Sequence, residues 1–489
     1  MIAVSIREKT AAAALALARG CEKIAEAVEF RLDEIPAGEI DTLLRGSPMR
    51  AIAACPLRGE GGGFDGTREE RAKRLADAAR AGAAFVDVDW RCAGDLAGLR
   101  GDVRAITSFH DFEGTPGDLD AVFRELAKLR AIPKVVTTAR RLEESFAPLR
   151  ALRRFGKEGI AFAMGEAGRA SRALAPLFGS LFTYASSAAG KETAPGQWTV
   201  SDLRALYPPG GPGPKTSVLG VVGRPIGHSI SPFVQGAALR TSGYDAIFLR
   251  FEANSLTEFL EAFDDPMLRG LAVTAPFKPE AVRVARRAAP AVVAAGAANT
   301  LARDESGFQA YNTDGPAAAD AIEAAMGGKI EGRVVLILGA GGAARAIGHE
   351  IGRRGARVAF AGRNAERVAA AAARVPKATA HALEEVRGIA HDVLVQATPI
   401  GTRDPSALPI PPEAIRSGTV VLDVVYDPAF TAILRAALDR GAKPVPGVEM
   451  FWRQAAAQFH LFTGADPPAD LMRAAARAAL RMPVEPTTS

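Results

Sequence analysis

The first 206 residues alternate short runs of β-branched and apolar side chains with longer stretches of helical periodicity. Each short run predicts a buried strand, and each longer stretch predicts a helix or a helix-like connection. Eight strands that each lead into such a connection are typical of a TIM (β/α)8 barrel. The expected strands are 2–6, 27–32, 50–54, 84–89, 105–109, 134–138, 160–164 and 181–185, and the clearest helices are 67–81, 118–130 and 141–155.

A Pro/Gly segment, Tyr207-Pro-Pro-Gly-Gly-Pro-Gly-Pro-Lys215, interrupts this pattern because it can form neither a helix nor a strand. We interpret 207–215 as a linker between independently folded halves, with the barrel at 1–206. After the linker, an α/β lobe is expected at 216–320 and a doubly wound Rossmann lobe at 321–447. The strands that carry this prediction are 218–222, 246–252 and 271–275 in the first lobe, and 333–339, 357–361, 392–396 and 420–424 in the second.

Composition places the 489-residue chain among soluble globular proteins, with 48% apolar and 24% charged residues. The pattern of strands and helices makes the fold class α/β. The net charge is +5, but Lys and Arg are scattered, so we expect small anionic substrates and no nucleic-acid partner. No apolar run is long enough to predict a membrane span. Cys21, Cys55 and Cys92 are odd in number and lack metal-ligand spacing, which predicts a cytoplasmic protein without disulfides or a metal site.

The first candidate site combines a histidine and a lysine on neighbouring strands of the predicted barrel. His110 stands in Ser-Phe-His-Asp-Phe, and Lys134 precedes a β-branched run. Inside a barrel, Lys134 would be desolvated, which disfavours its ammonium form and frees a nucleophilic amine, and His110 could then move protons. A surface lysine and a packed histidine are the simpler interpretation of each residue alone. Glu29, Arg31 and Arg172 also lie near the C-terminal rim, where barrels carry their chemistry, and favour the catalytic interpretation.

Residues 1–206 resemble the type I 3-dehydroquinate dehydratases. The resemblance rests on Val28-Glu-Phe-Arg-Leu-Asp33, Thr107-Ser-Phe-His110, Ile132-Pro-Lys134 and the loop from Met164 to Arg172. It implies that Lys134 forms a Schiff base with the C3 ketone of 3-dehydroquinate, that His110 moves the protons, and that no metal or diffusible cofactor takes part. The substrate contacts that it implies are Glu29, Arg31, Arg58, Arg172, Thr193 and Gln197.

One motif departs from that family. In Cys55-Pro-Leu-Arg58-Gly-Glu60-Gly-Gly, Pro56 occupies the place of the family's arginine, and Arg58 stands two positions later. We expect Arg58 to reach the site nevertheless. Thr193 stands where the family commonly has serine, which preserves a hydroxyl group.

The second candidate site begins at the Gly-rich turn Gly339-x-Gly341-x-x-Ala344, between a buried strand and a helix. Glycines in such a turn let backbone N–H groups approach a pyrophosphate at the helix N-terminus. The following strand ends near Arg363 and Arg367 instead of near an acidic residue. Two arginines one helical turn apart suit a 2′-phosphate and predict NADPH, although arginines that merely face solvent remain the alternative.

Several blocks between about residues 216 and 480 resemble the shikimate dehydrogenases. They include Gly223-Arg-Pro-Ile-Gly-His-Ser229-Ile-Ser231-Pro, Val273-Thr-Ala-Pro-Phe-Lys278 and Asn312-Thr-Asp314. The resemblance implies that Lys278 and Asp314 act on the reacting oxygen while hydride from NADP(H) reduces 3-dehydroshikimate, and that helices in 448–489 return to the substrate lobe. The substrate contacts that it implies are Ser229, Ser231, Thr274, Asn299, Tyr426 and Gln454. The cofactor contacts are Gly339, Gly341, Gly342, Ala343, Arg363, Arg367, Thr398 and Gly447.

The two resemblances together are similar to the plant-type fused arrangement, in which the product of the first half is the substrate of the second. We therefore expect a bifunctional enzyme for two consecutive steps toward shikimate. Three alternatives stay open: an active dehydrogenase beside an inactive dehydratase, a quinate dehydrogenase that uses NAD, and a catalytically dead metabolite sensor. A sensor should have lost one of Lys134, His110, Lys278 and Asp314, and all four are present.

Overall fold

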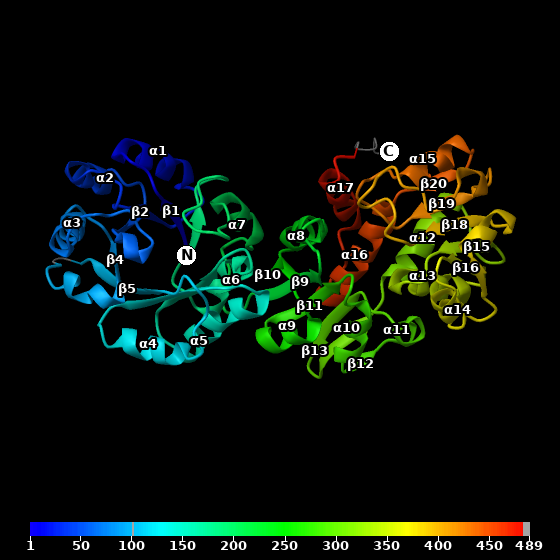
Figure 1. The fold of residues 1–489 in the computed structure, drawn as a ribbon, viewed down its shortest axis with the longest axis horizontal. Helices are drawn as coiled ribbons and strands as arrows, with labels where there is room; N and C mark the ends of the chain where they lie inside the picture. The colour runs from blue at the N-terminus through cyan, green and yellow to red at the C-terminus, as the bar shows by residue number, and fades with distance from the viewer. Residues whose placement is uncertain (100–101, 483–489) are drawn as a thin grey trace.

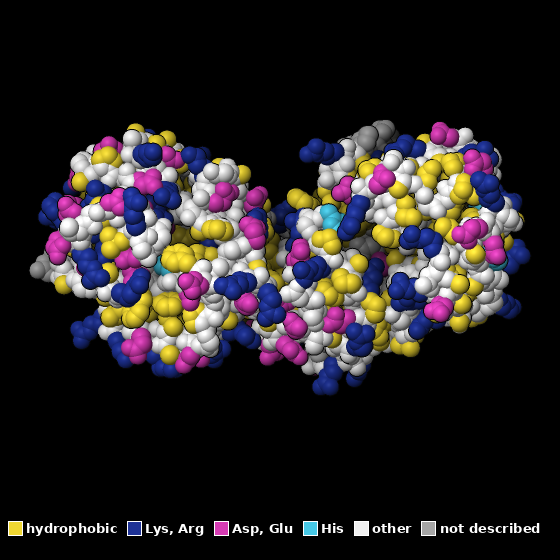
Figure 2. Space-filling view, in the orientation of Figure 1, with side chains coloured by type: hydrophobic (Ala, Val, Ile, Leu, Met, Phe, Trp, Pro, Cys, Tyr) yellow, Lys and Arg dark blue, Asp and Glu magenta, His cyan; other side chains and the backbone are white. Residues whose placement is uncertain are grey.

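The computed structural model describes residues 1–99 and 102–482, which form three α/β units in a row (Figure 1). The barrel, in blue to cyan, lies at one end, a mixed sheet in green lies in the middle, and a parallel sheet in yellow and orange lies at the other end. No helix of the described residues is long and apolar enough to cross a membrane. Figure 2 shows Lys and Arg scattered among acidic side chains over the visible face, without a continuous basic band.

The first unit is the eight-stranded parallel barrel that the alternating pattern predicted. Its strands follow the order β7-β6-β5-β4-β3-β2-β1-β8. A parallel bridge between Gly159 and Ser180 lies between the two outer strands of this order and nearly closes the ring. Every strand begins and ends within two residues of its predicted range. The strands are β1 (Ile2–Ile6), β2 (Ala27–Arg31), β3 (Arg50–Ala54), β4 (Phe85–Asp89), β5 (Arg104–His110), β6 (Ile132–Thr138), β7 (Ile160–Met164) and β8 (Thr183–Ser186).

The barrel helices begin at polar residues that satisfy their free N–H groups. Thr67 and Glu70, for example, form a capping box at the start of the third helix. The helices are α1 (Ala11–Cys21), α2 (Ile40–Arg45), α3 (Arg68–Arg80), α4 (Leu119–Ala127), α5 (Ala147–Phe155), α6 (Arg169–Leu174) and α7 (Val200–Leu206). Short 3-10 helices are η1 (Ala37–Glu39), η2 (Arg58–Glu60), η3 (Trp90–Leu96), η4 (Leu142–Phe146) and η5 (Ala175–Phe178).

The middle unit follows the Pro/Gly segment, which contains neither helix nor strand. Its six-stranded sheet has the order β10-β9-β11-β13-β14-β12. The antiparallel pair β13 and β14 was not predicted from the sequence. The strands are β9 (Ser217–Gly223), β10 (Ala246–Glu252), β11 (Leu268–Val273), β12 (Arg287–Ala288), β13 (Thr300–Asp304) and β14 (Gly307–Tyr311), and the helices are α8 (Ser231–Ser242), α9 (Leu256–Phe263), α10 (Lys278–Val284) and α11 (Pro290–Ala295).

The third unit is a parallel doubly wound sheet of order β17-β16-β15-β18-β19-β20. This is the Rossmann arrangement that the Gly-rich turn predicted, although the two edge strands, β17 and β20, were missed. The strands are β15 (Val334–Leu338), β16 (Arg357–Gly362), β17 (Thr379–Ala382), β18 (Val393–Gln396), β19 (Val420–Asp423) and β20 (Lys443–Val445). The helices are α12 (Asp314–Met326), α13 (Gly342–Arg353), α14 (Ala365–Ala372), α15 (Ala432–Asp439), η6 (Leu383–Gly388) and η7 (Pro412–Ala414).

The last two helices, α16 (Gly447–Thr463) and α17 (Ala469–Ala479), leave the Rossmann sheet and pack on the middle unit. Val448, Phe459 and Met472 share one apolar cluster with Leu219 and Val234 of that unit. The start of α16 therefore lies at the Rossmann sheet, and the rest of the helix runs along the middle sheet. Residues 483–489, which the sequence analysis included in the C-terminal segment, lie outside the described residues.

The barrel and the middle unit also pack directly against each other. The ring of Phe263, in α9, lies 5.0 Å from that of Phe146 and 6.3 Å from that of Phe178, both in the barrel half. Arg153, in α5, forms an ion pair with Asp265 of the middle unit. One continuous apolar cluster therefore runs from the barrel into the middle sheet. The linker pattern in the sequence did not predict this interface.

Candidate active sites

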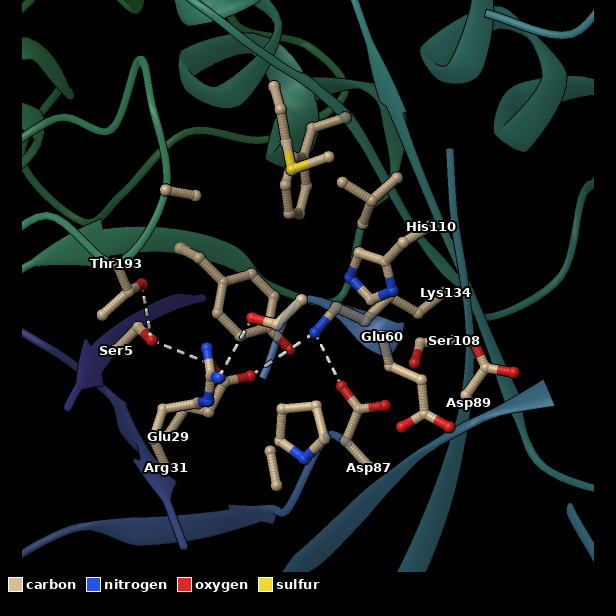
Figure 3. Close-up of a pocket in the computed structure, with 18 of the residues that line it drawn as sticks. Ser5, Glu29, Arg31, Glu60, Asp87, Asp89, Ser108, His110, Lys134 and Thr193 are labelled. Carbon is tan, nitrogen blue, oxygen red and sulfur yellow. Dashed lines mark hydrogen bonds and ion pairs between the residues drawn. The ribbon is translucent and has the colours of Figure 1, made fainter. Parts of the chain in front are cut away.

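A cavity of about 130 Å³ opens among the C-terminal ends of the barrel strands (Figure 3). Parallel strands bring their carboxyl ends to the same rim, so residues from distant parts of the chain meet there. The expected site residues that line the cavity are Glu29, Arg31, His110, Lys134, Arg172, Thr193 and Gln197.

Lys134 is held as an ion pair at the bottom of this cavity. Its Nζ lies 2.6 Å from Oδ2 of Asp87, 3.4 Å from Oε2 of Glu29 and 4.2 Å from the centre of the Tyr184 ring. Burial by itself lowers the pKa of Lys134, but the charges of Asp87 and Glu29 outweigh burial and raise that pKa above its ordinary value. The structure thus corrects the expectation of a neutral buried amine, because the two carboxylates favour the ammonium form.

His110 ends β5 and reaches the cavity beside Lys134. Because β5 pairs with β6 so that Ser108 is opposite Lys134, His110 lies two residues nearer the rim on the same face. Burial, together with the positive charge of Lys134, lowers the pKa of His110 to about 3. The imidazole is therefore neutral at neutral pH and able to accept a proton.

A chain of hydrogen bonds crosses the opposite wall. Ser5 Oγ donates to Glu29 Oε1 at 2.8 Å, and Thr193 Oγ1 donates to Ser5 Oγ at 3.0 Å. Gln197 Nε2 donates to Thr193 Oγ1 at 3.1 Å. These contacts orient Glu29 and tie it to the loop that carries Thr193 and Gln197.

Two arginines line the cavity, and they differ in their partners. Arg31 is bound by both oxygens of Asp33, at 2.9 and 2.8 Å. Arg172 is buried in α6 above the ring of Phe162, and burial lowers its pKa to about 10. Its Nε has no hydrogen-bond partner among the described residues. Its Nη2 donates a long hydrogen bond, of 3.5 Å, to the carbonyl oxygen of Pro195. A buried guanidinium with a free Nε–H group is suited to bind a carboxylate.

Arg58 does not reach the cavity, contrary to the prediction. Its side chain is 74% exposed and forms an ion pair with Asp65 on the surface. Arg58 belongs to η2, which ends at Gly61 with a positive φ of 79°, and this turn brings Pro56, Glu60 and Gly61 to the cavity instead. The two-position shift of the arginine in the sequence therefore removes it from the site.

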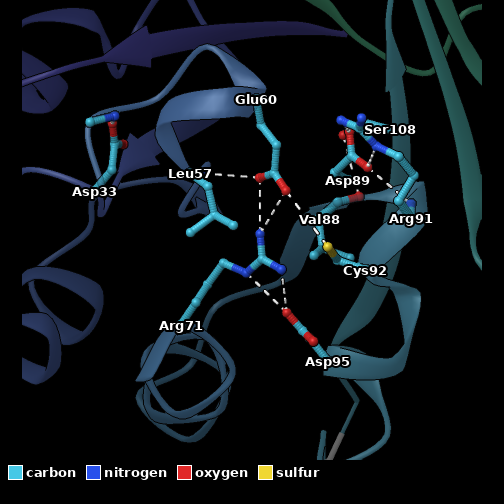
Figure 4. A network of polar contacts seen from close by, with 11 residues as sticks. Asp33, Leu57, Glu60, Arg71, Val88, Asp89, Arg91, Cys92, Asp95 and Ser108 are labelled. Carbon is cyan, nitrogen blue, oxygen red and sulfur yellow. Dashed lines mark hydrogen bonds and ion pairs between the residues drawn. The ribbon is translucent and has the colours of Figure 1, made fainter. Parts of the chain in front are cut away.

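Glu60, which the sequence analysis did not select, forms an ion pair with a fully buried arginine (Figure 4). Arg71 Nη1 lies 3.0 and 2.9 Å from the two oxygens of Glu60, and Arg71 Nε lies 2.9 Å from Asp95. Glu60, Asp89 and Cys92 each bring a possible metal-ligand atom within 4.8 Å of the others. Arg71 already neutralises Glu60, and Arg91 neutralises Asp89 at 2.8 Å, so we interpret this group as a positioning network.

Other lining residues that the sequence analysis missed are Ser5, Asp87, Asp89, Ser108 and Tyr184. A signal was present for two of them. Asp87 and Asp89 alternate in the apolar strand 85–89, and a period of two places both on the inner face of the barrel. Two carboxylates on the inside of a buried strand require positive partners, which are Lys134 and Arg91.

A second cavity, of about 190 Å³, lies between the middle unit and the Rossmann unit. All the substrate contacts expected in this half line it, together with both expected catalytic residues and two of the expected cofactor contacts. They are Ser229, Ser231, Thr274, Lys278, Asn299, Asp314, Ala343, Tyr426, Gly447 and Gln454.

Lys278 and Asp314 form the polar centre of this cavity. Lys278 Nζ lies 2.6 Å from Asp314 Oδ2, and Asn299 Nδ2 donates to Asp314 Oδ1 at 2.8 Å. Lys278 starts α10 and Asp314 starts α12, so each side chain projects from a helix N-terminus into the space between the lobes. Gln458, which was not selected, holds the Asn299 backbone by donating to its carbonyl oxygen at 3.0 Å.

Hydroxyl groups gather at the other end of the cavity. Ser229 Oγ donates to Ser231 Oγ at 3.2 Å, and both serines are buried. Burial raises the pKa of Tyr426 to about 12, against the opposing effect of its hydrogen bond with Ser229. Three neutral hydroxyl groups in one buried place are suited to bind a carboxylate group.

The Gly-rich turn fits a dinucleotide pyrophosphate. Gly339 has a φ of 109°, and a Cβ there would lie 3.0 Å from the carbonyl oxygen of Ala397 and 3.1 Å from Thr398 Cγ2. Gly341 stands before α13 without a side-chain cap, so the first N–H groups of the helix remain available to an anion.

The remaining expected cofactor residues lie along the same edge of the sheet. Arg363 follows the end of β16, and Arg367 lies in the first turn of α14. Both are exposed and make no ion pair among the described residues, which leaves them free for a phosphate. Thr398 Oγ1 donates to Gln396 Oε1 at 2.9 Å, and this contact shapes the loop after β18. A Cβ at Gly447 would lie 2.5 Å from the carbonyl oxygen of Val425, so only glycine lets α16 start this close to β19.

Comparisons with known proteins agree with this division into two sites. Residues 2–209 match the model of type I 3-dehydroquinase. Residues 221–301 match the shikimate dehydrogenase substrate binding domain, and 447–477 match the shikimate 5'-dehydrogenase C-terminal domain.

Similar individual proteins fall into the same two groups. The chain is 31% identical over 477 residues to a chloroplastic bifunctional 3-dehydroquinate dehydratase/shikimate dehydrogenase from Arabidopsis thaliana, covering 91% of this chain and 79% of that protein. It is 38% identical over 275 residues to an NADP(+) shikimate dehydrogenase from Halorubrum lacusprofundi, covering 54% of this chain and 99% of that one. A shikimate 5-dehydrogenase from Thermus thermophilus, solved with NADP(H) and shikimate, superposes with a TM-score of 0.50 and 32% identity, covering 54% of this chain and 100% of that chain.

Proposed function

The chain belongs to the family of bifunctional 3-dehydroquinate dehydratase/shikimate dehydrogenases, and from this premise we propose which residues carry its two reactions. It is a shikimate-pathway enzyme that combines a lyase with an NADP-dependent oxidoreductase. The observation that carries the assignment is that two separate cavities each contain a buried or half-buried lysine in contact with a carboxylate. We assign 1–206 to the dehydratase, 207–215 to the linker, 216–320 to the substrate lobe, 321–447 to the NADP lobe and 448–489 to the C-terminal segment that contains the returning helices α16 and α17.

In the barrel, Lys134 attacks the C3 ketone of 3-dehydroquinate, and loss of water from the adduct gives an imine. Asp87, at 2.6 Å, is the nearest acceptor for the proton that the ammonium group must lose before it attacks. The imine accepts electrons from the neighbouring C–H bond, so His110 can remove a C2 proton and then give a proton to the departing C1 hydroxyl. Water hydrolyses the imine, regenerates Lys134 and releases 3-dehydroshikimate.

The rest of the barrel cavity binds the substrate in this proposal. Arg172 pairs with the substrate carboxylate, supported by its burial and its free Nε. Glu29, Arg31, Thr193 and Gln197 face the hydroxyl groups, supported by the hydrogen-bond chain from Gln197 to Glu29.

In the second cavity, Ser229, Ser231 and Tyr426 bind the carboxylate of 3-dehydroshikimate, and Lys278 meets its C3 oxygen. NADPH supplies the hydride to C3. Lys278 donates a proton to the developing alkoxide or stabilises it electrostatically, and Asp314 holds the ammonium group in place. Asn299, Thr274 and Gln454 position the ring, supported by the contact of Asn299 with Asp314.

Residues of the Rossmann lobe hold the cofactor in this proposal. The backbone of Gly339, Gly341, Gly342 and Ala343 takes the pyrophosphate, and Arg363 and Arg367 take the 2′-phosphate. Thr398 and Gly447 border the nicotinamide side. The free start of α13, and the lack of an ion pair at either arginine among the described residues, support this arrangement.

We also propose a cytoplasmic location. Its support is that the three cysteines, Cys21, Cys55 and Cys92, are buried free thiols. Such thiols suit a reducing compartment.

A one-pot assay tests the function. Purified protein with 3-dehydroquinate should produce the ultraviolet absorbance of a conjugated enone, and added NADPH should then be oxidised as the enone disappears. Lys134→Met should abolish the first signal and leave reduction of supplied 3-dehydroshikimate intact, and Lys278→Met should do the reverse. Loss of both signals in either variant would contradict the assignment of one reaction to each cavity. Quinate with NAD+ as the alternative substrate pair should give a much slower reaction than shikimate with NADP+.

A further inference from the structure

The two lobes of the dehydrogenase half meet at the end of α11, where the more buried part of the contact is made by Arg345. Arg345, in the first turn of α13, donates from Nε to the carbonyl oxygen of Ala295 at 2.7 Å and from Nη2 to that of Gly296 at 3.3 Å. Its Nη1 donates to the carbonyl oxygen of Ala340, within the Gly-rich turn, at 3.2 Å. Cations bind well at the free carbonyl groups of a helix C-terminus, and here the cation belongs to the opposite lobe.

The segment that accepts these bonds leads directly into the substrate site. The carbonyl oxygen of Ala297 accepts from Asn312 Nδ2 at 2.9 Å, and the N–H of Ala298 donates to the carbonyl oxygen of Lys278 at 2.9 Å. Asn299, the next residue, binds Asp314. The main chain just beyond the contact with Arg345 therefore supports the backbone of Lys278 and, through Asn299, the carboxylate of Asp314.

The Gly-rich turn also packs closely against the segment that follows α11. A Cβ at Gly342 would lie 3.2 Å from Cβ of Ala297 and 3.5 Å from Cδ of Lys278. The turn thus packs against the lysine itself, so the position of the turn and the position of Lys278 depend on each other.

We propose that Arg345 is a positioning residue for the reduction. It fixes the position of the Gly-rich turn relative to the segment that carries Asn299 and contacts Lys278. Hydride transfer needs its donor and acceptor atoms, held by different lobes, at a fixed separation. A misplacement of about 1 Å can lower such a rate about 100-fold. The inference rests on the assignment of Lys278 to the reduction.

Arg345→Met and Arg345→Lys test this role. In Arg345→Met we expect the dehydrogenase kcat to fall about 100-fold, with a smaller loss in Arg345→Lys. The deuterium isotope effect with NADPH labelled at the transferred position should increase, because hydride transfer becomes the slow step. Backbone amide exchange over 296–299, measured without any nucleotide, should accelerate. Dehydratase activity in the same molecule should stay at the wild-type level, which reports that the barrel is folded, and an unchanged KM for NADPH reports that the Rossmann lobe is folded.

Arg374→Met is the matched control. Arg374 is exposed and donates a single hydrogen bond to the carbonyl oxygen of Ala294, at 3.1 Å, at the same helix end. We expect it to leave kcat and the isotope effect near wild type. A raised KM for NADPH with unchanged kcat and isotope effect in Arg345→Met would overturn the proposal, since Arg345 would then act as a cofactor ligand. Unchanged amide exchange would also overturn it, whereas an inactive wild-type dehydrogenase would contradict the proposed function instead.

Discussion

The Nζ of Lys134 lies 2.6 Å from Oδ2 of Asp87, so the proposed nucleophile of the barrel rests as one partner of a buried ion pair. Burial alone would favour the neutral amine, but the nearby carboxylates favour the ammonium form. Reaction therefore requires that a proton leave Lys134 within the cavity. Asp87 is the nearest acceptor for that proton, whereas the sequence motif identifies only the lysine.

Asp87→Asn should lower the pKa of Lys134, because it removes one negative charge and leaves the burial unchanged. The neutral amine that forms the imine would then be available at lower pH than in the wild type. Borohydride trapping of the imine with 3-dehydroquinate, followed by mass spectrometry as a function of pH, measures this shift. Asp65→Asn, which alters only the exposed pair with Arg58, should leave the profile in place. An unshifted profile in Asp87→Asn would show that Asp87 does not control the lysine.

Arg172→Met should weaken the dehydratase, whereas Arg58→Met should not. Arg172 is buried with a free Nε, so its loss removes a charge-assisted contact with the substrate carboxylate worth about 1.5–3 kcal/mol, or roughly 10–100-fold in kcat/KM. Arg58 forms its ion pair with Asp65 at the surface, away from the cavity. Steady-state rates with 3-dehydroquinate compare the two variants, and the heat resistance of their residual dehydratase activity checks the folding of the barrel in each. Equal losses in both variants would mean that the loop at 56–61 rearranges when substrate binds.

Much of the fold was accessible from the sequence because its signals are local. Each barrel strand is a short apolar run beside a helix, and Gly339 and Gly341 mark the kind of turn that lets a helix start close to a phosphate. The positions of His110 and Lys134 followed from the strands that carry them. Local patterns therefore predict well which rim of the barrel, or which edge of a sheet, a side chain reaches.

The direction of a loop side chain and the partner of an apolar face are not local properties. Arg58 carries the expected positive charge and lies close to the expected position in the sequence, but the turn at Gly61 directs its side chain to solvent. Phe259 and Phe263 look like the buried face of any amphipathic helix, and nothing in their spacing indicates that the barrel is what covers them. Whether burial or a counter-charge controls Lys134 likewise depends on strands that are far apart in the chain.

Arg363 and Arg367 should determine the preference for NADPH over NADH. Replacing both with Ala removes the groups proposed to bind the 2′-phosphate, and we expect the KM for NADPH to rise at least about tenfold. The KM for NADH should change little, since NADH lacks that phosphate. Reduction of 3-dehydroshikimate with each nucleotide measures both constants. An equal loss with NADPH and NADH would indicate that the arginines support the fold of the lobe and do not recognise the phosphate.

Phe263→Ala should destabilise the barrel, although Phe263 belongs to the dehydrogenase half. Its fully buried ring packs on Phe146 and Phe178 of the barrel, and removing a buried phenylalanine costs about 3–5 kcal/mol. Dehydratase activity should therefore be lost at a lower temperature than in the wild type, as measured by residual activity after heating. Phe360→Ala is the matched control, because Phe360 is equally buried but lies in the Rossmann core. It should reduce the heat resistance of the dehydrogenase and leave that of the dehydratase unchanged. If both variants left the dehydratase unaffected, the two halves would be stable independently, as the linker alone would suggest.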